Sequence, residues 1–506
     1  MPATAAFVAL ALGACVANNG SGPAVSRLAV AASEPQAALI GRQILAEGGN
    51  AADAAVATAL TMAATLPSRV GIAGGGACLV HDPEEATVRA LDFLPLAPDR
   101  MPSGGVKPAA VPGMLRGLAA LHAEYGSLRW EVLVAAAENA ARFGNPVSRA
   151  LARDIGPAVQ VLSRDPEAVR ILSRSSGTAV QEGDPLVQPE LAAFLGQIRV
   201  EGVGGFYNGA LGRRYAEAAT AAGYPLSVDA LRDYRPRWRE PLTLQAGNDL
   251  LYFAPHESAA GPEQALMWHM LTAVRDYGAV PADERLHLLV EAQRRATAAP
   301  AGTTVDAASA ARLMEGYDPG RATAPARELA GATTFSAGLS ILAEDETGVA
   351  CGFTTNGLFG AGKVAPGTGI FIAPVASPGV NALGGIAMIA NEPTARLVYA
   401  GTGADVMVAL TTPLAEVVLR GTGLEDALGM ARAAPDFTSP AVVVDEFAEP
   451  EQVQALRSRG HEVVPAPAVG HGTAIACDRA RDGSRTCAAA TDPRGAGLAT
   501  ILQAGS

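Results

Sequence analysis

Cysteine spacing is the first feature of this chain that bears on chemistry. Cys477 and Cys487 flank a polar stretch containing Asp482-Gly483, which predicts two strands joined by a turn. That turn brings the two sulfurs together, so we expect a local disulfide in an oxidising compartment. No CxxC pair occurs and the seven His are scattered along the chain, so we predict neither a zinc site nor a cofactor.

A run of three glycines, Gly74-Gly75-Gly76, is the next candidate for chemistry. It does not match GxGxxG, it has no P-loop Lys, and it leads into a strand-like segment. A phosphate site needs a helix N-terminus at that point. The run therefore predicts close packing of the backbone.

The N-terminal residues 1–26 have the features of an export signal. A short apolar run, too short to cross a membrane, ends in Leu12-Gly13-Ala14-Cys15. These four residues match the bacterial lipoprotein box, in which Cys15 is lipidated and the polar stretch that follows serves as a tether. An ordinary cleaved signal is the alternative. Both readings place the mature protein outside the cytoplasm, in the periplasm or cell envelope, with a membrane contact only through a lipid anchor.

The periodicity of the remaining chain predicts an α+β protein with strands at both ends and a mainly helical segment between them. A polar stretch at 294–334 lacks periodicity and predicts an exposed linker. The order of elements suits an αββα sandwich. Strands are expected at 27–34, after Gly76, and at 339–343, 349–354, 370–373, 397–400, 441–444, 462–464, 472–477 and 486–490; helices are expected at 35–48, 51–64, 130–143, 189–200, 209–222, 228–234, 265–277, 404–420 and 423–432.

Composition limits the classes of partner. Hydrophobic residues make up 49% of the 506 residues and charged residues 17%, which predicts a large core and no global disorder. The formal net charge is −12, and a nucleic-acid partner needs a basic face, so none is expected.

Several motifs together carry a resemblance to a known family. On these motifs, residues 27–500 resemble the gamma-glutamyltransferases (gamma-glutamyltranspeptidases or glutathione hydrolases), which are N-terminal-nucleophile hydrolases. The motifs are Ala32-Ser33, Ile44–Val56, the Gly74–Gly76 strand, Val111-Pro112-Gly113, Tyr125-Gly126, Phe206–Gly209, Trp238–Leu242, His287–Ala292, Asn356–Gly362, Pro366–Gly369 and Asp492-Pro493-Arg494.

The resemblance implies a precursor that cuts itself into a large subunit, here 27–335, and a small subunit, here 336–506. A Thr hydroxyl attacks the preceding carbonyl and becomes the N-terminal nucleophile. Its own α-amine is then the base for attack on a γ-glutamyl amide of a small-molecule substrate. Such acyl transfer needs a nucleophile, a base and oxyanion donors.

The nucleophile position departs from the family pattern. The family's Thr-Thr-His-x-Ser motif falls on 336–340, and in this register we assign the nucleophile position to Ala337, which has no hydroxyl. Ser336 is one alternative, although a shift of one residue on a strand turns the side chain to the other face. Thr334, Thr333 or an engineered Ala337 are further alternatives.

The substrate pocket implied by the family departs as well. Leu94 stands where the family has the Arg for the substrate α-carboxylate, and the segment 373–378 lacks the acid that reads the α-amine. The paired serines fall on Leu383-Gly384-Gly385, and the oxyanion Gly-Gly falls on Gly403-Ala404. Thr354, Asn356 and Gly403 are retained.

Three functions therefore remain open. The first is an amidohydrolase that uses Ser336 on a different acyl substrate. The second is a pseudoenzyme, a non-catalytic envelope lipoprotein that binds a small molecule. The third is ordinary glutathione hydrolysis, which needs the lost Arg and acid to come from elsewhere in the chain, and no motif in the sequence supplies them. The departures favour lost or changed activity.

Overall fold

The computed structural model describes residues 26–102, 105–255, 260–300, 302–324, 336–376, 383–391, 394–403, 406–436, 438–479 and 485–503. Cys15, Thr333, Thr334 and Ala404 of the sequence analysis lie outside these ranges. Among the described residues, no helix is both long and apolar enough to cross a bilayer.

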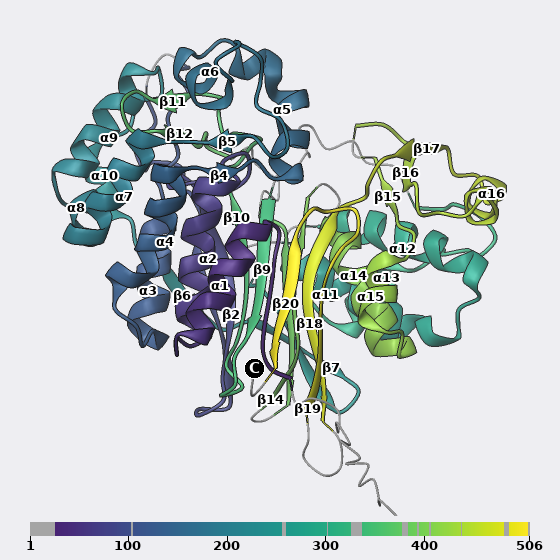
Figure 1. Cartoon of the computed structure of the whole chain (residues 1–506). Coiled ribbons are helices and arrows are strands. Elements are labelled where there is room, and N and C mark those ends of the chain that lie inside the picture. The colour runs from purple at the N-terminus through teal and green to yellow at the C-terminus, as the bar shows by residue number, and fades with distance from the viewer. Residues whose placement is uncertain are drawn as a thin grey trace, which may run out of the picture.

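Two sheets packed face to face form the centre of the molecule (Figure 1). The first sheet has seven strands in the order β20 (Leu498–Gln503), β1 (Ser26–Ala32), β9 (Ser336–Leu342), β10 (Gly348–Thr354), β2 (Gly75–Asp82), β3 (Thr87–Phe93) and β6 (Arg237–Arg239). The second has six strands in the order β19 (Arg485–Thr491), β18 (His471–Arg479), β14 (Thr394–Thr402), β13 (Gly385–Asn391), β8 (Asp249–Phe253) and β7 (Leu242–Ala246). Small apolar residues such as Ala31, Ala350 and Ala400 fill the space between the sheets.

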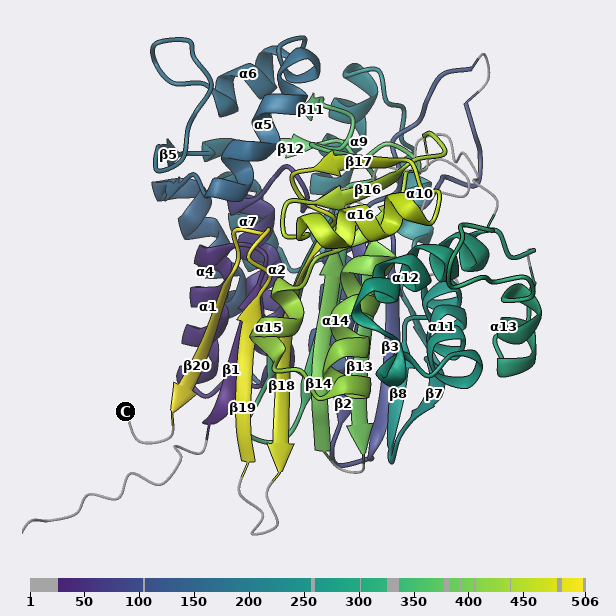
Figure 2. The same ribbon diagram turned by 90° about the vertical axis from the view of Figure 1, so that its right-hand side faces the viewer.

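Helices cover the outer face of each sheet, which completes the predicted αββα arrangement (Figures 1 and 2). The first sheet is covered by α1 (Pro35–Ala46), α2 (Ala51–Thr65) and α3 (Met114–Tyr125), and α4 (Trp130–Phe143) packs on the outside of α2. The second is covered by α11 (Gly261–His269), α14 (Val406–Arg420) and α15 (Leu424–Gly429).

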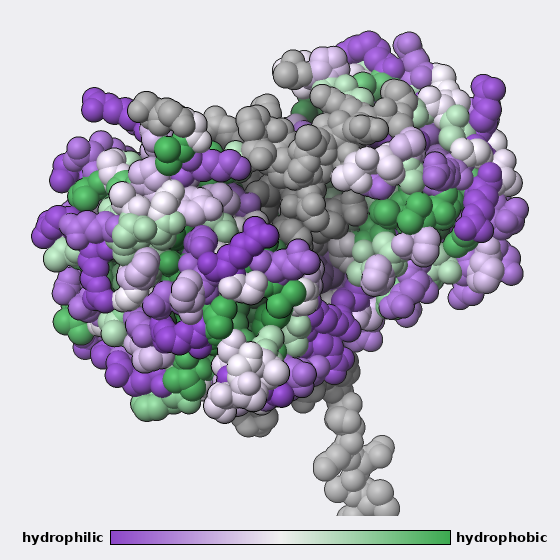
Figure 3. Space-filling model, turned by 90° about the horizontal axis from the view of Figure 1, so that it is seen from above, coloured by the Kyte–Doolittle hydropathy of each residue, from purple (hydrophilic) through white to green (hydrophobic). Residues whose placement is uncertain are grey.

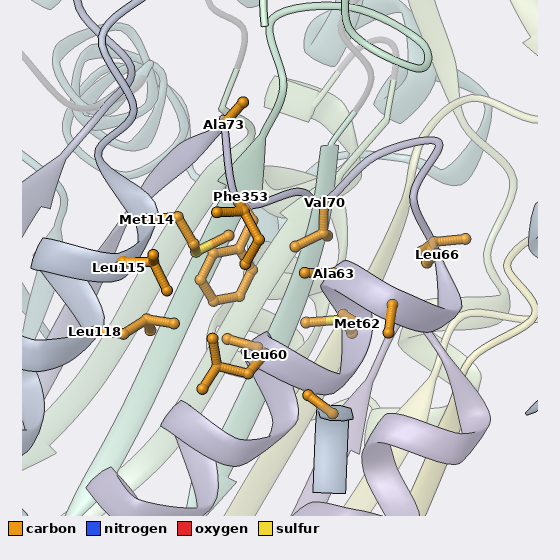
Figure 4. Close-up of a cluster of buried hydrophobic side chains, with 14 of the residues drawn as sticks. Leu60, Met62, Ala63, Leu66, Val70, Ala73, Met114, Leu115, Leu118 and Phe353 are labelled. Carbon is orange, nitrogen blue, oxygen red and sulfur yellow. The ribbon is translucent and has the colours of Figure 1, made fainter. Parts of the chain in front are cut away.

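The helix α2 explains why the composition is rich in alanine. All of its residues are buried, because it lies between the first sheet and the outer helices. Small side chains allow this close approach, and Phe353 of β10 fills the space among Leu60, Met62 and the α3 side chains (Figure 4). The Ala-rich segment therefore forms the core of the helix–sheet interface.

Two lobes rise above one end of the sandwich (Figure 2). The helical lobe holds α5 (Arg149–Leu162), α6 (Pro166–Leu172), α7 (Pro189–Glu201), α8 (Gly204–Tyr207), α9 (Ala210–Ala221) and α10 (Val228–Asp233), with the strand pairs β4 (Asn145–Pro146), β5 (Pro185–Leu186) and β11 (Val364–Ala365), β12 (Ile370–Phe371). The small lobe holds β15 (Ala433–Pro435), β16 (Val442–Asp445), β17 (Val463–Ala466) and α16 (Pro450–Ser458). Seen from above, hydrophilic residues dominate the outer rims of both lobes (Figure 3).

The predicted exposed linker at 294–334 is wrong at its start, while many of the described residues between 300 and 321 are exposed as predicted. Arg294 and Arg295 belong to α12 (Ala282–Thr297) and are buried, where Arg295 pairs with Glu291 at 2.8 Å. A further helix, α13, spans Ala307–Leu313. The two arginines misled the prediction because Arg295 is paired with Glu291 and Arg294 donates to the carbonyls of Pro440 and Ala441 inside the fold. Residues 325–335 lie outside the described ranges.

Other predicted elements appear with shifted ends or were missed. The helix expected at 265–277 ends as α11 at His269 and continues as a π-helical turn, Met270–Val274, before a short 3₁₀ turn, Tyr277–Ala279. The sequence analysis did not predict β3, β7, β8, β13 or β20.

Candidate functional site

The first strand after the proposed cleavage region, β9, presents two different faces. Gly338 and Ser340 face the second sheet: a Cβ on Gly338 would lie 2.7 Å from the Ala400 Cβ, and Ser340 Oγ donates to the Thr473 carbonyl at 2.9 Å. Side chains alternate along a strand, so Ser336 shares this face. The two side chains between them, Ala337 and Leu339, lie on the helix side, in the core that contains α2.

Ser336 lies at the first position of β9, fully buried, with its hydroxyl between the two sheets. Its Oγ accepts a hydrogen bond from the Gly403 N–H at 3.1 Å. Thr354 lies opposite it on β10. This N–H therefore lies beside the serine oxygen, close to where an oxyanion would form if Ser336 attacked an acyl group.

Ala337 lies on the other face of β9. It is opposite Phe353 in the ladder, fully buried, and packed in the helix-side core. The interpretation that assigns the nucleophile position to Ala337 therefore does not agree with the geometry, because strand alternation turns this side chain away from Gly403. The sequence already indicated this orientation, because Ser336 and Ser340 are four residues apart on one strand and their side chains therefore lie on the same face.

Two glycines close the site around Ser336 and need a left-handed backbone. Gly403 has φ +90° and Gly384 has φ +100°. A Cβ on Gly384 would lie 2.7 Å from the Gly401 carbonyl and 3.1 Å from Ser336 Oγ. Gly384 therefore has no room for a serine of the family, whereas a Cβ on Gly385 would lie 2.0 Å from Gln264 Nε2 and would require that side chain to move.

Thr354 and Asn356 hold the turn after β10. Thr354 Oγ1 accepts from the Asn356 N–H at 2.9 Å, and Asn356 Nδ2 donates to the Pro374 carbonyl at 2.9 Å. Asn356 has φ +58°, which asparagine tolerates better than most residues. These bonds give both residues a structural role beside Ser336.

Leu94 places an apolar side chain where the family resemblance implies a guanidinium. The side chain packs against the core between the sheets, and the Leu94 carbonyl accepts from the Tyr234 hydroxyl at 2.9 Å. This position therefore offers no charge to a substrate carboxylate.

A hydrogen-bonded chain behind Gly403 was not predicted. Arg69 forms two bonds of 2.7 Å to Asp154, and its Nη1 donates to His471 Nε2 at 2.6 Å. Because Arg only donates, His471 Nε2 accepts and its proton lies on Nδ1, which donates to Thr402 (2.7 Å to Oγ1, 3.0 Å to the carbonyl). Burial, and then the charge of Arg69, lower the pKa of His471 to about 4, so the ring is neutral near pH 7.

These hydrogen bonds hold His471 and Thr402 against Gly403, the residue whose N–H donates to Ser336. Thr402 directly precedes Gly403, and a Cβ on Gly403 would lie 3.3 Å from the His471 ring. The imidazole therefore fills the space behind the Gly403 N–H. Sequence reasoning had no signal for this contact, since Arg69 and His471 are 402 residues apart.

A cavity of about 410 Å³ begins at Gly403 and runs between the helical lobe and the small lobe. Its lining mixes charged side chains with small apolar residues and draws them from many elements: Arg69, Arg153, Gly403, Glu446, Pro467, Ala468, Gly470, His471, Pro493 and Arg494. Gly403 lines this cavity and its N–H donates to Ser336 Oγ, so the cavity adjoins the residue that contacts the serine hydroxyl.

Two disulfides are present. Cys477–Cys487 joins β18 to β19, at the pair that the spacing indicated. Cys78–Cys351 joins β2 to β10, where the two residues are cross-strand neighbours. The second pair is 273 residues apart, so only the sheet register reveals it.

A group of possible metal ligands lies in another part of the molecule, although no metal site was expected. His287, Glu291 and His461 offer ligand atoms within 4.8 Å of one another. His287 pairs with His461 at 2.8 Å and donates to the Asp318 carbonyl at 2.9 Å, while Glu291 Oε2 accepts from Thr323, Ala324 and Arg295. These bonds join α12 to the small lobe, and we assign them that structural role.

Comparisons with known proteins agree with this architecture. Residues 37–374 match the gamma-glutamyltranspeptidase family. Acylase ACY 1 proenzyme of Pseudomonas sp. strain V22 is 31% identical over 522 residues, which is 92% of each chain. Glutathione hydrolase proenzyme of Pseudomonas aeruginosa is 29% identical over 444 residues, or 77% of each chain. The cephalosporin acylase of Bacillus halodurans has the same fold, with a TM-score of 0.80 over 95% of this chain and 96% of that one at 21% identity.

Proposed function

Since this chain belongs to the gamma-glutamyltranspeptidase family, we propose that it is an amide-bond hydrolase that uses Ser336 as its nucleophile. The observation that carries the proposal is the 3.1 Å hydrogen bond from the Gly403 N–H to Ser336 Oγ. It joins a nucleophilic oxygen to a backbone donor at the end of a polar cavity. Ala337, by contrast, has no hydroxyl to act as a nucleophile, and its side chain lies on the face of β9 away from the Gly403 N–H.

The proposed reaction begins within the chain. Ser336 Oγ attacks the carbonyl carbon of residue 335, the C–N bond breaks, and the hydroxyl proton moves to the departing nitrogen. Water hydrolyses the resulting ester and leaves Ser336 as a free N-terminus of the region 336–506. The relatives named as proenzymes support a cleaved precursor.

The same serine then acts on an external amide. Its freed α-amine takes the Oγ proton, Oγ attacks the substrate carbonyl, and the Gly403 N–H stabilises the developing oxyanion. The protonated amine gives its proton to the leaving nitrogen, and water releases the acyl group. Thr354 lies across the ladder from Ser336 and holds the neighbouring turn.

We infer that the acyl substrate differs from a γ-glutamyl group. Leu94 removes the guanidinium that the family uses for the α-carboxylate, and 373–378 contains no acid. An Arg–carboxylate pair contributes about 2–5 kcal/mol when it is desolvated, so its loss lowers γ-glutamyl hydrolysis strongly. The match to an acylase over nearly the whole chain supports a different acyl group.

The decisive test is a reducing denaturing gel of the purified protein, followed by mass spectrometry of each new N-terminus. We expect a fragment that begins at Ser336 in the wild type and an intact chain in Ser336→Ala. A wild-type chain that stays intact for days would reject the proposal and favour the non-catalytic binding protein. Hydrolysis of glutathione at rates ordinary for the family would instead reject the altered substrate.

We also propose that the protein is exported and that Cys15 is lipidated. The two disulfides support an oxidising compartment. Metabolic labelling with a radioactive fatty acid should label the wild type and leave Cys15→Ser unlabelled. Export without label in the wild type would indicate an ordinary cleaved signal.

A further inference from the structure

The cavity beside Gly403 contains the positive charge of Arg153, which has no counter-ion among the residues that the structure describes. We propose that Arg153 in this cavity binds a carboxylate group of the amide substrate. This inference rests on the proposed function, because the cavity extends from the residue that contacts Ser336. It identifies the substrate as a carboxylate-bearing amide.

Two of the three arginines in the cavity are already neutralised. Arg69 forms its bidentate pair with Asp154 and donates its remaining nitrogen to His471. Arg494 pairs with Asp445 at 2.6 Å and with Asp492 at 3.1 Å, and it also donates to the carbonyls of Leu428 and Met430. Neither guanidinium is free to bind a ligand as its main partner.

Arg153 differs from both. Its side chain is exposed at the cavity, and its one hydrogen bond to a described residue goes from Nη1 to the Arg494 carbonyl at 3.3 Å. Among the described residues no carboxylate lies within ion-pair distance of it. Guanidinium N–H groups match the geometry of a carboxylate, and this one has several of them unused.

The position of Arg153 is firmly held although its side chain is free. It lies on α5 directly before Asp154, which is buried and bound to both Arg69 and Ser68. The backbone of Arg153 is therefore fixed at the wall of the cavity. Because the backbone is already ordered, a ligand that binds the side chain has no backbone segment to order.

In this proposal the residue that binds the substrate carboxylate is on the helix α5, and not at the family's arginine position. The family position on the first sheet holds Leu94, while the charged residue here comes from the helical lobe. Glu446 lines the same cavity and is exposed, so its negative charge opposes an anionic ligand. We therefore expect the carboxylate to lie on the Arg153 side, and neutralising Glu446 should strengthen its binding.

The test uses the full chain and matched chromogenic anilides. Pentanoyl and glutaryl 4-nitroanilides differ only in a terminal carboxylate on the acyl group. A second pair, pentanoyl anilides of 4-nitroaniline and 3-carboxy-4-nitroaniline, places the carboxylate on the leaving group. We expect one carboxylate probe to exceed its uncharged partner in kcat/KM, which also tells whether the acyl or the amine portion occupies the cavity.

Substitutions assign the preference to Arg153. Arg153→Gln should lower kcat/KM for the preferred carboxylate probe about three- to tenfold and leave the uncharged probe unchanged, with partial recovery in Arg153→Lys. Arg149→Gln is the matched control, since Arg149 lies on the same helix, is exposed and pairs with Glu182 away from the cavity. Glu446→Gln should raise the preference.

The outcomes separate this inference from the proposed function. If the wild type cleaves no probe, calorimetric titration with the same probes measures binding directly, and an Arg153-dependent preference still supports the inference. Cleavage with no carboxylate preference, or a preference that survives in Arg153→Gln, overturns it while the hydrolase proposal stands.

Discussion

Ser336 and Ala337 are neighbours on one strand, yet their side chains lie in different layers of the molecule. Ser336 Oγ meets the Gly403 N–H between the two sheets, and the Ala337 methyl group packs on the helix side opposite Phe353. The proposed chemistry at this strand therefore depends on position 336. The small side chain of Ala337 suits the close packing between the sheet and the helices.

A swap of hydroxyl positions tests this relationship. Ser336→Ala should abolish chain cleavage and hydrolysis, and adding Ala337→Ser to that variant should restore neither. The new hydroxyl would instead be buried among apolar side chains and lower the free energy of unfolding by about 1–3 kcal/mol. Gel analysis and denaturant unfolding measure both effects; restored cleavage in the double variant would return the nucleophile position to 337.

The disulfide between Cys78 and Cys351 predicts how the cleaved protein behaves. Cys78 belongs to the region before Ser336 and Cys351 to the region after it, so the bond joins both fragments. A non-reducing denaturing gel should show one band at the full mass, and reduction should separate two. Cys351→Ser should give two bands under both conditions, whereas Cys487→Ser, which removes a disulfide within one fragment, should not.

Gly403→Ala should lower kcat about a hundredfold, because its N–H must keep its aim at the oxyanion. The residue has φ +90°, and an added Cβ would lie 3.3 Å from His471. Gly421→Ala is the control, since Gly421 has φ +70° but open space around it. Both variants should lose about 1–2 kcal/mol of stability from the left-handed backbone, and only Gly403→Ala should lose activity. Equal activities would argue against Gly403 as the oxyanion donor.

The stability of the protein should fall between pH 6.5 and pH 4 through His471. Its pKa is lowered from 6.5 to about 4 in the folded state, so the unfolded chain binds the extra proton first as the pH falls. This contribution is fully present above pH 6.5 and is lost towards pH 4, on the order of 3 kcal/mol.

The variant His471→Gln should flatten that part of the pH–stability curve, since Gln does not titrate and still offers Arg69 an acceptor. His122→Gln, a change on α3 away from this network, should keep the wild-type slope. Thermal unfolding across this pH range compares the two. An unchanged slope in His471→Gln would mean that the imidazole is not held neutral by burial and Arg69.

Much of the architecture follows from local pattern. The hairpin at 339–354, the helices at 35–46 and 130–143, and the family motifs were readable from hydrophobic periodicity and turn residues, because these depend on near neighbours. The disulfide between Cys477 and Cys487 follows from a single turn for the same reason. The linker prediction failed where Arg295 is paired with Glu291 inside the fold.

The sequence by itself determined the family, the sandwich and the identity of the two residues that compete for the nucleophile role. Only the tertiary structure decided which of them faces Gly403. The pleat of a strand makes neighbouring side chains alternate, but the packing of sheets and helices decides which face of the strand meets the second sheet. It also brought together Arg69 with His471, and Cys78 with Cys351. Partners separated by hundreds of residues leave no local pattern, since their contact exists only after the sheets have assembled.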